Sequence, residues 1–572
     1  MDFKQQIAQT LASLVQWSPD DVAAALEVPQ DSRMGDFAFP CFRLAKTLRK
    51  APPAIAADLC AQIAKPAIVE RLEAVGGYLN FFVDKNVWAS AVLGDIAAAG
   101  DGYGATKEGE GKTILIDYSS INIAKPFAHH HLTTTALGHA LYRVYQNLGY
   151  RVVGINHLGD WGTQFGKQIV AYKLWGDSEA VKSGGIRELV RLYVKYHDEA
   201  EMNPELDDQA RAWFKKIEDG DEEALSLFNW FKEITIKEVQ QVYDLLGIHF
   251  DSYNGEAFFS DKMEPVVEEL QAKGLLKESE GALIVDLEAY KMPPCIIKKR
   301  DGTSLYATRD LAAALWRKKE YDFAQCLYVV AYQQNLHFAQ LFKVLELMGY
   351  EWASDMKHVN FGMVSMAEGA MSTRQGRVVW LEDVLKASVE KALDIIKEKS
   401  PDLVDKETVA RQVGIGAVVF SVLCNNRIKD IVFSWDSVLN FDGETAPYLQ
   451  YTHARCNSVL RKAGENLNIS ISAAGPAGAD YTVLSSDEAQ AVIKELAAFP
   501  DAVQEAAARY EPMLISRCII EVAKTFNKFY YEHRILDGTP EEIRAKLALV
   551  DAVRLVIKRG LYLLGIEAPN QM

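Results

Sequence analysis

The first part of the chain alternates between helical and extended patterns of apolar residues. Apolar positions recur at helical spacing in IAQTLASLVQW (7–17) and PPAIAADLCAQIAK (52–65). The segment YLNFFVD (78–84) instead has the large apolar residues of a strand. Between the two helices, SRMGDFAFP (32–40) is rich in turn-forming residues and predicts a turn. Together these patterns predict a small α+β domain over residues 1–110.

The pattern changes after residue 110 to that of a parallel sheet. The apolar run KTILIDYSS (112–120) predicts a buried strand, and HLTTTALGHALYRVYQNLGY (131–150) predicts a helix. RVVGINHLGDWG (151–162) predicts a second strand that leads into a glycine-rich loop. This order is a βαβ unit, and open α/β sheets bind ligands at the carboxyl ends of their strands.

The remaining pattern predicts a Rossmann-type α/β domain over 111–403 and an all-α domain over 404–572. Residues from about 166 to 290 are helix-rich and charged, which indicates an insertion into the first of these domains. Within the helical domain, the glycine-rich segment 464–488 predicts a surface loop. The α/β pattern returns in SLYATRDLAAALWRKK (304–319), CLYVVAYQQNLHF (326–338) and KHVNFGMVS (357–365).

Composition places the chain among water-soluble proteins. Its 572 residues are too many for one core, and hydrophobic residues make up 49%. No run of about 18 apolar residues is present, so no membrane span is expected. The seven cysteines are scattered without a CxxC pair, which favours a reducing, cytoplasmic location.

The net charge of −16 opposes nucleic-acid binding by the chain as a whole, but basic residues cluster locally. Each cluster can be a solvated helix face, and their meaning depends on whether they share one side of the fold. A nucleic-acid partner therefore stays open at this point. The clusters are Arg43, Lys46, Arg49 and Lys50; Arg427 and Lys429; and Arg455, Arg461 and Lys462.

Three adjacent histidines, His129, His130 and His131, lie where the turn after Ser120 leads into a helix. Such turns bind anions through backbone N–H groups and the helix dipole, so a histidine there could donate to a phosphate. A zinc site is not predicted, because side chains of adjacent residues diverge and no cysteine is near. The alternative is an exposed polar turn.

Tyr306 and Asp310 lie four residues apart and share one face of a predicted helix. A phenol beside a carboxylate suits a cationic ligand, and a guanidinium pairs best with a carboxylate. The alternative is a pair at the helix N-terminus that binds no ligand. The loop GAMSTRQGRV (369–378) has the composition of a mobile loop that contacts phosphates, which is a weak signal by itself.

Taken together, the segments resemble the class I aminoacyl-tRNA synthetases, and within them the arginyl-tRNA synthetase family. The resemblance covers nearly the whole chain. It implies a Rossmann-type catalytic domain, an α+β N-terminal domain of the tRNA-elbow type and an all-α anticodon-binding domain. The matching segments are GDFAFPCFRLAK, IDYSSINIAKPF, GINHLGDWGTQFG, LYATRD, QQNLHF, FSWDSVLNFDGETAPYLQYTHAR and LLGIEAP.

The resemblance also implies which residues form the site. L-arginine would be held by an acid, an amide, a phenol, a second acid and a second amide: Asp117, Asn122, Tyr306, Asp310 and Gln334. The nucleotide would contact His131, Gly159, Asp160, Gln164 and Met371, with Asn156 and His157 in its surroundings. The catalytic residues would be Ser120, His131, Ser372 and Thr373.

Two signatures of the family are altered in this chain. The family commonly reads SSPNIAKPFHVGHLR, whereas this chain reads SSINIAKPFAHHHLT. Ala128 replaces the first histidine, His129 and His130 fill the middle, and His131 matches the second histidine. We expect the His130 side chain to take up space that adenine needs against a glycine. Ala370 stands where the lysine of the KMS signature would be.

Two functions therefore compete. The first is an arginine–tRNA ligase that uses ATP and Mg²⁺, acts on L-arginine and tRNA(Arg), and is cytoplasmic and monomeric, with no resident metal. The second is a protein that keeps the fold and the arginine pocket without adenylation, either a paralogue or an engineered variant. It is favoured by Ala128, His130 and Ala370, because a lost transition-state donor costs about 10²- to 10³-fold in rate.

Overall fold

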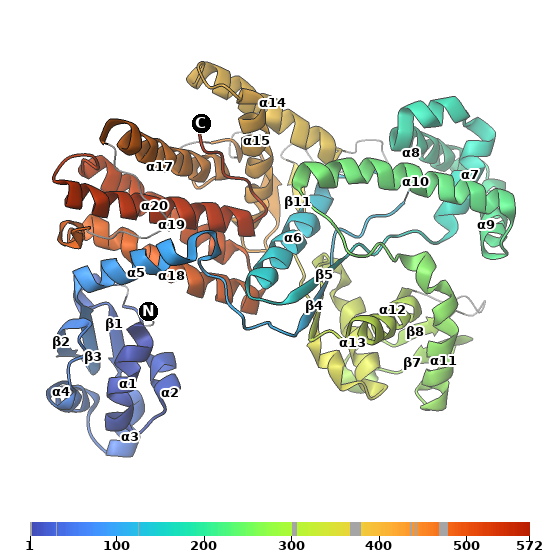
Figure 1. Ribbon diagram of the computed structural model, residues 1–572. Coiled ribbons are helices and arrows are strands. Elements are labelled where there is room, and N and C mark those ends of the chain that lie inside the picture. The colour runs from blue at the N-terminus through green and yellow to red at the C-terminus, as the bar shows by residue number, and fades with distance from the viewer. Residues whose placement is uncertain are drawn as a thin grey trace. The chain divides into compact units, whose positions relative to one another are not determined.

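The computed structural model describes the parts of the chain that are drawn as coloured ribbon in Figure 1. They are residues 3–29, 31–123, 125–299, 306–366, 379–434, 438–440, 443–467 and 479–572.

The chain divides into two units that each combine distant segments. The first comprises Met1–Tyr103, Arg455–Phe499 and Glu521–Ile557, and the second comprises Gly104–Ala454, Pro500–Ile520 and Lys558–Met572. The C-terminal helices thus contribute to both units. The domain boundaries inferred from sequence, at 110 and 403, stay a prediction.

The first unit contains an antiparallel sheet with the strand order β1-β3-β2. Phe37 and Phe39 of β1 are buried, so the turn predicted for residues 32–40 is wrong in its second half. These two side chains fill the core beside Phe81 of β3, and that burial outweighs the local turn composition. The elements are α1 (Phe3–Val15), α2 (Pro19–Ala25), β1 (Phe37–Pro40), α3 (Ala45–Leu48), α4 (Pro52–Gln62), β2 (Val69–Val75), β3 (Tyr78–Val83) and α5 (Lys85–Ala99).

The C-terminal part is helical, as the sequence predicts. The predicted loop begins later than expected, because α17 continues through Gly464 to Leu467. An i,i+4 ion pair between Arg461 and Glu465 supports this extra turn. Residues 468–478 of the predicted loop lie outside the described residues. The long helices are α17 (Ala446–Leu467), α18 (Asp487–Arg509), α19 (Met513–Glu532) and α20 (Pro540–Leu563).

A four-stranded parallel sheet with the order β10-β9-β4-β5 lies at the centre of the second unit. The predicted βαβ unit is confirmed as β4 (Thr113–Asp117), α6 (Leu132–Asn147) and β5 (Arg151–Ile155). The chain crosses from β4 to β5 on one side and later returns to pair β9 (Gln325–Tyr328) with β4 on the other. The switch point therefore lies at the carboxyl end of β4.

The segment between the two halves of the sheet begins with four helices that cluster together in Figure 1. It ends in an antiparallel sheet, β6-β7-β8, which the sequence did not indicate. The strands of that sheet are short, and LKES in β6 is mostly exposed, so they lack an apolar periodicity. The elements are α7 (Thr163–Trp175), α8 (Ser178–Met202), α9 (Glu205–Glu218), α10 (Glu222–Leu246), α11 (Met263–Ala272), β6 (Leu276–Ser279), β7 (Ala282–Val285) and β8 (Cys295–Lys298).

The predicted return of the α/β pattern is confirmed in the helices and strands that follow. A parallel pair, β11 with β12, joins the end of this region to the segment after α15. Among the described residues, no helix has the length and apolar character needed to cross a membrane. The elements are α12 (Tyr306–Tyr321), α13 (Asn335–Leu347), β10 (Met356–His358), β11 (Val364–Met366), α14 (Leu381–Lys399), α15 (Lys406–Leu423) and β12 (Ile431–Phe433).

Close packing of α7 on α9 generates a stability prediction. A methyl group at Gly166 of α7 would meet the carbonyl oxygen of Ala210 in α9. We expect Gly166→Ala to cost about 1–3 kcal/mol and to lower the thermal unfolding midpoint by about 3–6 °C. Gly94→Ala in α5 is the control, because that position has open space around it and alanine favours helix. An unchanged midpoint for Gly166→Ala would contradict the observed packing.

Candidate functional site

The turn after β4 is fixed by hydroxyl groups of the following helix. Ser119 adopts a left-handed backbone with φ of 62°. Its N–H donates to Thr134 Oγ1 at 3.0 Å, and its hydroxyl lies 2.7 Å from Thr135 Oγ1. The same hydroxyl lies 2.9 Å from the Tyr243 hydroxyl, which also accepts from Asn156 Nδ2 at 2.7 Å. The strand end, the helix start and α10 are thereby held together.

His129 is a core residue. Its ring is fully buried and lies edge-on to Phe433, with 5.0 Å between the ring centroids. Among the described residues, neither ring nitrogen has a hydrogen-bond partner. Burial lowers the pKa of His129 to about 4, so the ring is neutral at pH 7. This side chain fills space and offers no exposed donor.

The His131 ring contacts the backbone of Ala128, the residue before the short helical turn His129–His131. Its Nδ1 lies 3.1 Å from the Ala128 nitrogen and 3.2 Å from the Ala128 oxygen; the ring proton is on Nε2 in the tautomer that accepts from the N–H and on Nδ1 in the tautomer that donates to the carbonyl. Burial lowers the pKa of His131 to about 3, which keeps the ring neutral. The expectation that the three side chains diverge is wrong for His130 and His131, whose ring centroids lie 4.1 Å apart. That His130 takes up the space of adenine stays a prediction.

Asp117 ends β4 and is engaged by two partners. Ser120 donates its hydroxyl to Oδ1 at 2.7 Å, so two predicted site residues are in contact. Arg317 of α12 lies 2.8 Å from Oδ2 and is only 1% exposed. Sequence reasoning missed Arg317. Its position seven residues after Asp310, two turns along the same face, was the signal that could have revealed it.

Asp310 lies one turn after Tyr306 at the start of α12, as predicted. His337 Nε2 is 2.6 Å from Asp310 Oδ2. Burial alone would raise the pKa of Asp310, but the hydrogen bond and charge of His337, with His157 and Arg317, hold it below its usual value. The Tyr306 side chain is 66% exposed.

Gln334 ends the short helical turn Tyr332–Gln334 that precedes α13, and its side chain is exposed. No hydrogen bond between this side chain and the other predicted arginine-binding residues is present in the described chain. Its neighbour Asn335 accepts from Asn360 Nδ2 at 3.0 Å, and Arg427 donates to Asn360 Oδ1 at 2.7 Å. The turn that carries Gln334 is therefore adjacent to a polar network.

Asn122 and Gly159 lie against each other where the loops after β4 and β5 meet. They form a parallel bridge, and the Ile123 N–H donates to the Gly159 carbonyl at 3.1 Å. A Cβ atom at Gly159 would meet the Asn122 side chain, so a larger residue here would require that side chain to move. Gln164 Nε2 lies 3.5 Å from the Gly159 oxygen, at the limit of a hydrogen bond.

Asp160 binds other parts of the protein through both carboxylate oxygens. Lys232 of α10 lies 2.6 Å from Oδ2, and the Ala257 N–H donates to Oδ1 at 2.9 Å. Glu256, which precedes Ala257 in the chain, forms an ion pair with Arg309 at an N–O distance of 3.1 Å. These contacts tie the insertion to the site. Sequence reasoning missed Lys232, Glu256 and Arg309, although Arg309 lies within the LYATRD segment.

His157 lies beside the Asp117–Arg317 pair. Its Nδ1 is 3.3 Å from the Asn254 carbonyl and 3.4 Å from an Arg317 nitrogen. The remaining predicted residues, Ala370, Met371, Ser372 and Thr373, lie outside the described residues, and their roles stay predictions.

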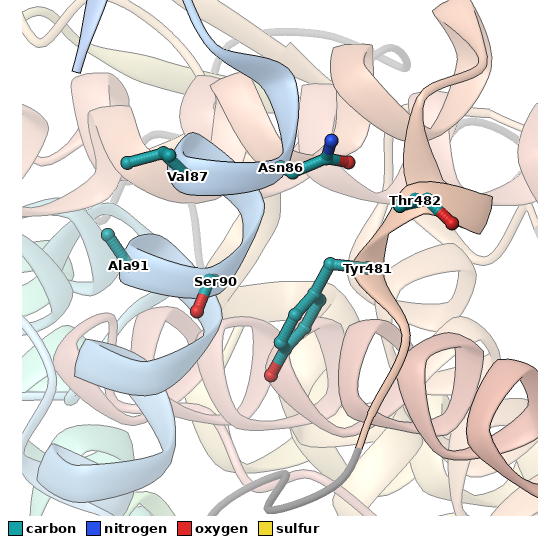
Figure 2. Close-up of a pocket in the computed structure, with 6 residues that line it drawn as sticks. All are labelled: Asn86, Val87, Ser90, Ala91, Tyr481 and Thr482. Atoms are coloured by element: carbon teal, nitrogen blue, oxygen red, sulfur yellow. The ribbon is translucent and has the colours of Figure 1, made fainter. Parts of the chain in front are cut away.

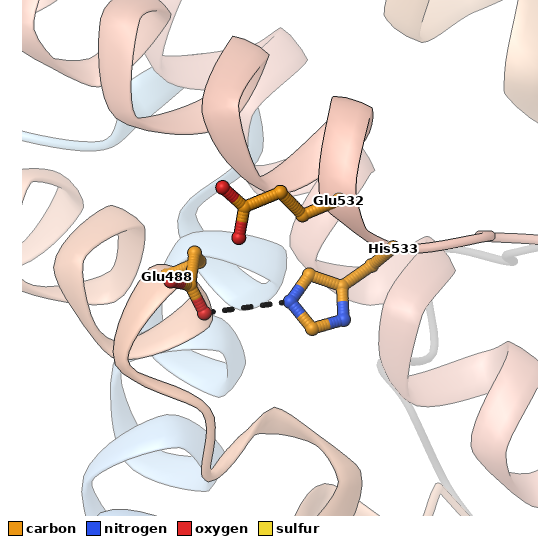
Figure 3. Close-up of side chains that lie close together, drawn as sticks. All are labelled: Glu488, Glu532 and His533. Atoms are coloured by element: carbon orange, nitrogen blue, oxygen red, sulfur yellow. Dashed lines mark ion pairs between the residues drawn. The ribbon is translucent and has the colours of Figure 1, made fainter.

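The carboxylates around β4 do not converge as a metal site. Asp117, Asp160, Glu256 and Asp310 each contact a cationic or histidine side chain instead. In the described chain, the one group of three converging metal-ligand side chains is Glu488, Glu532 and His533, which belongs to the first unit (Figure 3). Glu488 already lies 3.6 Å from His533 and 3.5 Å from Lys528.

A surface hollow of about 460 Å³ also belongs to the first unit. Figure 2 shows Ser90 of α5 on one side of it and Tyr481 on the other. Its lining residues carry no charge, and none of them was predicted for the site. This hollow therefore lacks the charged side chains that would pair with the phosphates of a nucleotide or the charged ends of an amino acid.

Three family profiles match the chain. The profile described as "tRNA synthetases class I (R), catalytic domain" matches residues 95–435. "DALR anticodon binding domain" matches residues 449–572, and "Arginyl tRNA synthetase N terminal domain" matches residues 1–83.

Several known proteins are similar to this chain over its full length. An arginine–tRNA ligase of Alkaliphilus metalliredigens is 53% identical over 572 residues, and one of Clostridioides difficile is 50% identical, each covering 100% of both chains. The Thermus thermophilus arginyl-tRNA synthetase structure has a TM-score of 0.81 at 25% identity and covers 100% of this chain and 99% of its own. The Plasmodium falciparum structure, with a TM-score of 0.79 at 21% identity and 99% coverage of both chains, shares the fold.

Glu256 generates a pH prediction. Burial raises the pKa of Glu256 from 4.5 to about 7, although Arg309 opposes the shift. Between pH 4.5 and 7 the folded protein thus binds more protons at this carboxyl than the unfolded chain, so stability falls as pH rises. As the pH rises through that window, we expect the free energy of unfolding to fall less for Glu256→Gln than for the parent. The difference should be about 3 kcal/mol at most.

Thermal unfolding midpoints at a series of pH values measure this difference. Glu264→Gln is the matched control, because Glu264 pairs with Lys298 and its side chain is 62% exposed. Parallel curves for Glu256→Gln and the parent would show that Glu256 ionises in the folded protein as it does in the unfolded chain.

Proposed function

The chain belongs to the arginyl-tRNA synthetase family of class I aminoacyl-tRNA synthetases, and we propose that its site activates L-arginine with ATP and transfers it to tRNA(Arg). The family assignment makes it an arginine–tRNA ligase. The observation that best supports the proposed location of the site is the grouping of Asp117, Ser120, Asp310 and Arg317 at the carboxyl end of β4.

The guanidinium of L-arginine would pair with Asp310, a carboxylate whose pKa is held below its usual value. Tyr306 begins the same helix one turn earlier and would lie against the flat face or edge of the guanidinium. Asn122 and Gln334 would receive the polar groups at the other end of the amino acid, and Asp117 would complete the pocket. Such charge-assisted pairs supply both affinity and orientation.

ATP would lie at the start of α6. Backbone N–H groups of that first turn and the positive end of the helix dipole favour phosphate. His131 is neutral, and in the tautomer whose Nδ1 accepts from the Ala128 N–H it would present its Nε2–H to a phosphate oxygen. Gly159, Asp160 and Gln164 would border the nucleotide from the loop after β5, and Met371, Ser372 and Thr373 would approach it from the signature loop.

The reaction would proceed in two transfers. First, a carboxylate oxygen of arginine attacks the α-phosphorus of ATP, and the bond to pyrophosphate breaks. Then a hydroxyl of the 3′-terminal adenosine of tRNA attacks the arginyl carbonyl, and AMP leaves. Holding the arginine carboxylate near the α-phosphorus is the chief contribution of the pocket. His131 would stabilise negative charge at the phosphate as the first transfer proceeds.

Mg²⁺ fits this site only as a partner of the ATP phosphates. The described carboxylates of the site already have partners, as given above for Asp117, Asp160, Glu256 and Asp310. When bound to the phosphates, the ion would neutralise part of their charge.

The rewritten signature supports slow adenylation. Ala128 has no donor for the phosphate, and Ala370 has no charge for the leaving pyrophosphate. A second imidazole, that of His130, lies against His131, the histidine that would act in catalysis. The competing function, arginine binding without adenylation, rests on these three positions.

The location and assembly follow from the same family. We place the protein in the cytoplasm, where its tRNA would be, and expect it to act as a monomer. The residues matched by the N-terminal and anticodon-binding profiles would contact tRNA(Arg).

ATP–pyrophosphate exchange tests the ligase function. We expect exchange that requires both L-arginine and tRNA(Arg). Asp310→Asn should lower kcat/KM for arginine by about 100-fold or more, because a charged partner of the guanidinium is lost. Asp322→Asn is the control, since that carboxylate pairs with Lys318 at the far end of the helix. Exchange at background in the parent, with arginine binding retained, would favour the competing function.

Restoring the signatures generates a second prediction. The triple substitution Ala128→His, His130→Gly and Ala370→Lys should raise the exchange rate by about 10²-fold or more, since each added donor acts in the transition state. The single change Ala128→Val adds bulk without a donor and should not raise it. A triple variant no faster than the parent would show that these positions do not limit adenylation.

A further inference from the structure

Arg317 occupies an unusual place for an arginine. Its side chain is buried beneath the carboxyl end of the sheet, with the guanidinium carbon 5.4 Å from the centre of the Tyr328 ring. Its Nη2 lies 2.8 Å from Asp117 Oδ2 and 3.4 Å from His157 Nδ1. Its Nε has no hydrogen-bond partner among the described residues.

A buried guanidinium is costly to desolvate, so it needs a compensating charge. Burial alone would lower the pKa of Arg317, but Asp117 outweighs burial, and the side chain stays cationic. The pair joins α12 to the end of β4, two elements that are far apart in sequence. The ion pair is therefore part of the wall of the proposed pocket.

This pair changes what Asp117 can do. Oδ2 contacts Arg317, and Oδ1 accepts from Ser120 at 2.7 Å. A substrate guanidinium binds most strongly when both of its nitrogens meet both oxygens of one carboxylate. Asp117 has both oxygens engaged, and the Arg317 cation would repel a second guanidinium.

Asp310 differs from Asp117 in this respect. Among the described residues, the side-chain hydrogen bond of Asp310 joins its Oδ2 to His337 Nε2, at 2.6 Å. The charge of Arg317 also contributes to lowering the pKa of Asp310. A single histidine, which is a cation only when protonated, competes less for the carboxylate than a permanent guanidinium does.

We propose that Arg317 is a positioning residue of the arginine pocket: by holding Asp117 in an ion pair, it leaves Asp310 as the carboxylate that receives the substrate guanidinium. The inference rests on the proposed function, because it takes L-arginine as the ligand of this pocket. Arg317 acts through Asp117 and does not itself contact the substrate.

Calorimetric titration of the full-length protein with L-arginine tests this inference without requiring adenylation. Arg317→Met leaves Asp117 buried and unpaired, so affinity should fall by about tenfold or more. Asp117→Asn leaves the cation unpaired and should have a similar effect. The double variant removes both charges and should bind arginine more tightly than either single variant, because paired sites are not additive.

Two further variants keep the test decisive. Arg317→Lys retains the charge and should bind arginine more tightly than Arg317→Met. Lys318→Met is the matched control, since this neighbouring cation pairs with Asp322 and should change affinity by no more than about twofold. Thermal unfolding of each variant confirms that the titrated protein is folded.

Three outcomes overturn the proposal. If Arg317→Met binds arginine as tightly as the parent does, the ion pair does not position the pocket. A double variant as weak as Asp117→Asn would show that Asp117 and Arg317 do not act as a pair in the pocket. Absence of arginine binding in the folded parent would also overturn it.

Exchange kinetics separate this inference from the ligase function. In an active protein, Arg317→Met should raise KM for arginine and leave KM for ATP within about twofold, whereas misfolding would lower kcat alone. A parent that binds arginine but shows no exchange contradicts the ligase function, and the titrations still decide the role of Arg317.

Discussion

The parallel pairing of β4 with a strand on each side is the constraint on which the second unit depends. Asp117 stands opposite Ile155 in β5 and opposite Tyr328 in β9. The strand order therefore reverses direction at β4, and ligands of such sheets bind at the carboxyl end of the strand where the order reverses. The helix α6, the insertion and α12 all contribute residues around that strand end.

Charge compensation is the second organising feature of this region. Four acidic residues, Asp117, Asp160, Glu256 and Asp310, each contact a basic or histidine side chain from another element. These contacts offset part of the desolvation cost of burying charge. They also distribute the roles: pairs with lysine or arginine hold elements together, while the carboxylate beside a histidine is better suited to receive a cationic ligand.

The three histidines illustrate how burial sets chemistry. His129 is a core ring against Phe433, and the His131 ring contacts the Ala128 backbone, with both pKa values lowered by burial. Neither would carry a positive charge at neutral pH. A neutral imidazole can still donate one hydrogen bond to a phosphate, but it cannot supply the electrostatic attraction of a protonated one. The nucleotide site therefore depends more on the helix N-terminus than on histidine charge.

Local sequence determined most of the secondary structure and the fold class, because apolar periodicity and glycine placement act over a few residues. It predicted β4, α6 and β5, the helical C-terminal region, and the shared face of Tyr306 and Asp310. Where it failed, distant packing decided: Phe37 and Phe39 form a strand because β3 lies beside them. The strands β6 to β8 were not indicated, because they are short and half exposed.

The sequence also indicated, through its resemblance to a family, which residues to look for, but it did not determine their partners. Only the tertiary structure decided that Arg317 pairs with Asp117, that Lys232 pairs with Asp160 and that His337 pairs with Asp310. Each pair joins residues from different parts of the chain. Even the pair that is closest in sequence, Asp310 with His337, is separated by 27 positions. Such contacts are set by how strands and helices converge, and convergence is a property of the folded chain that no local pattern records.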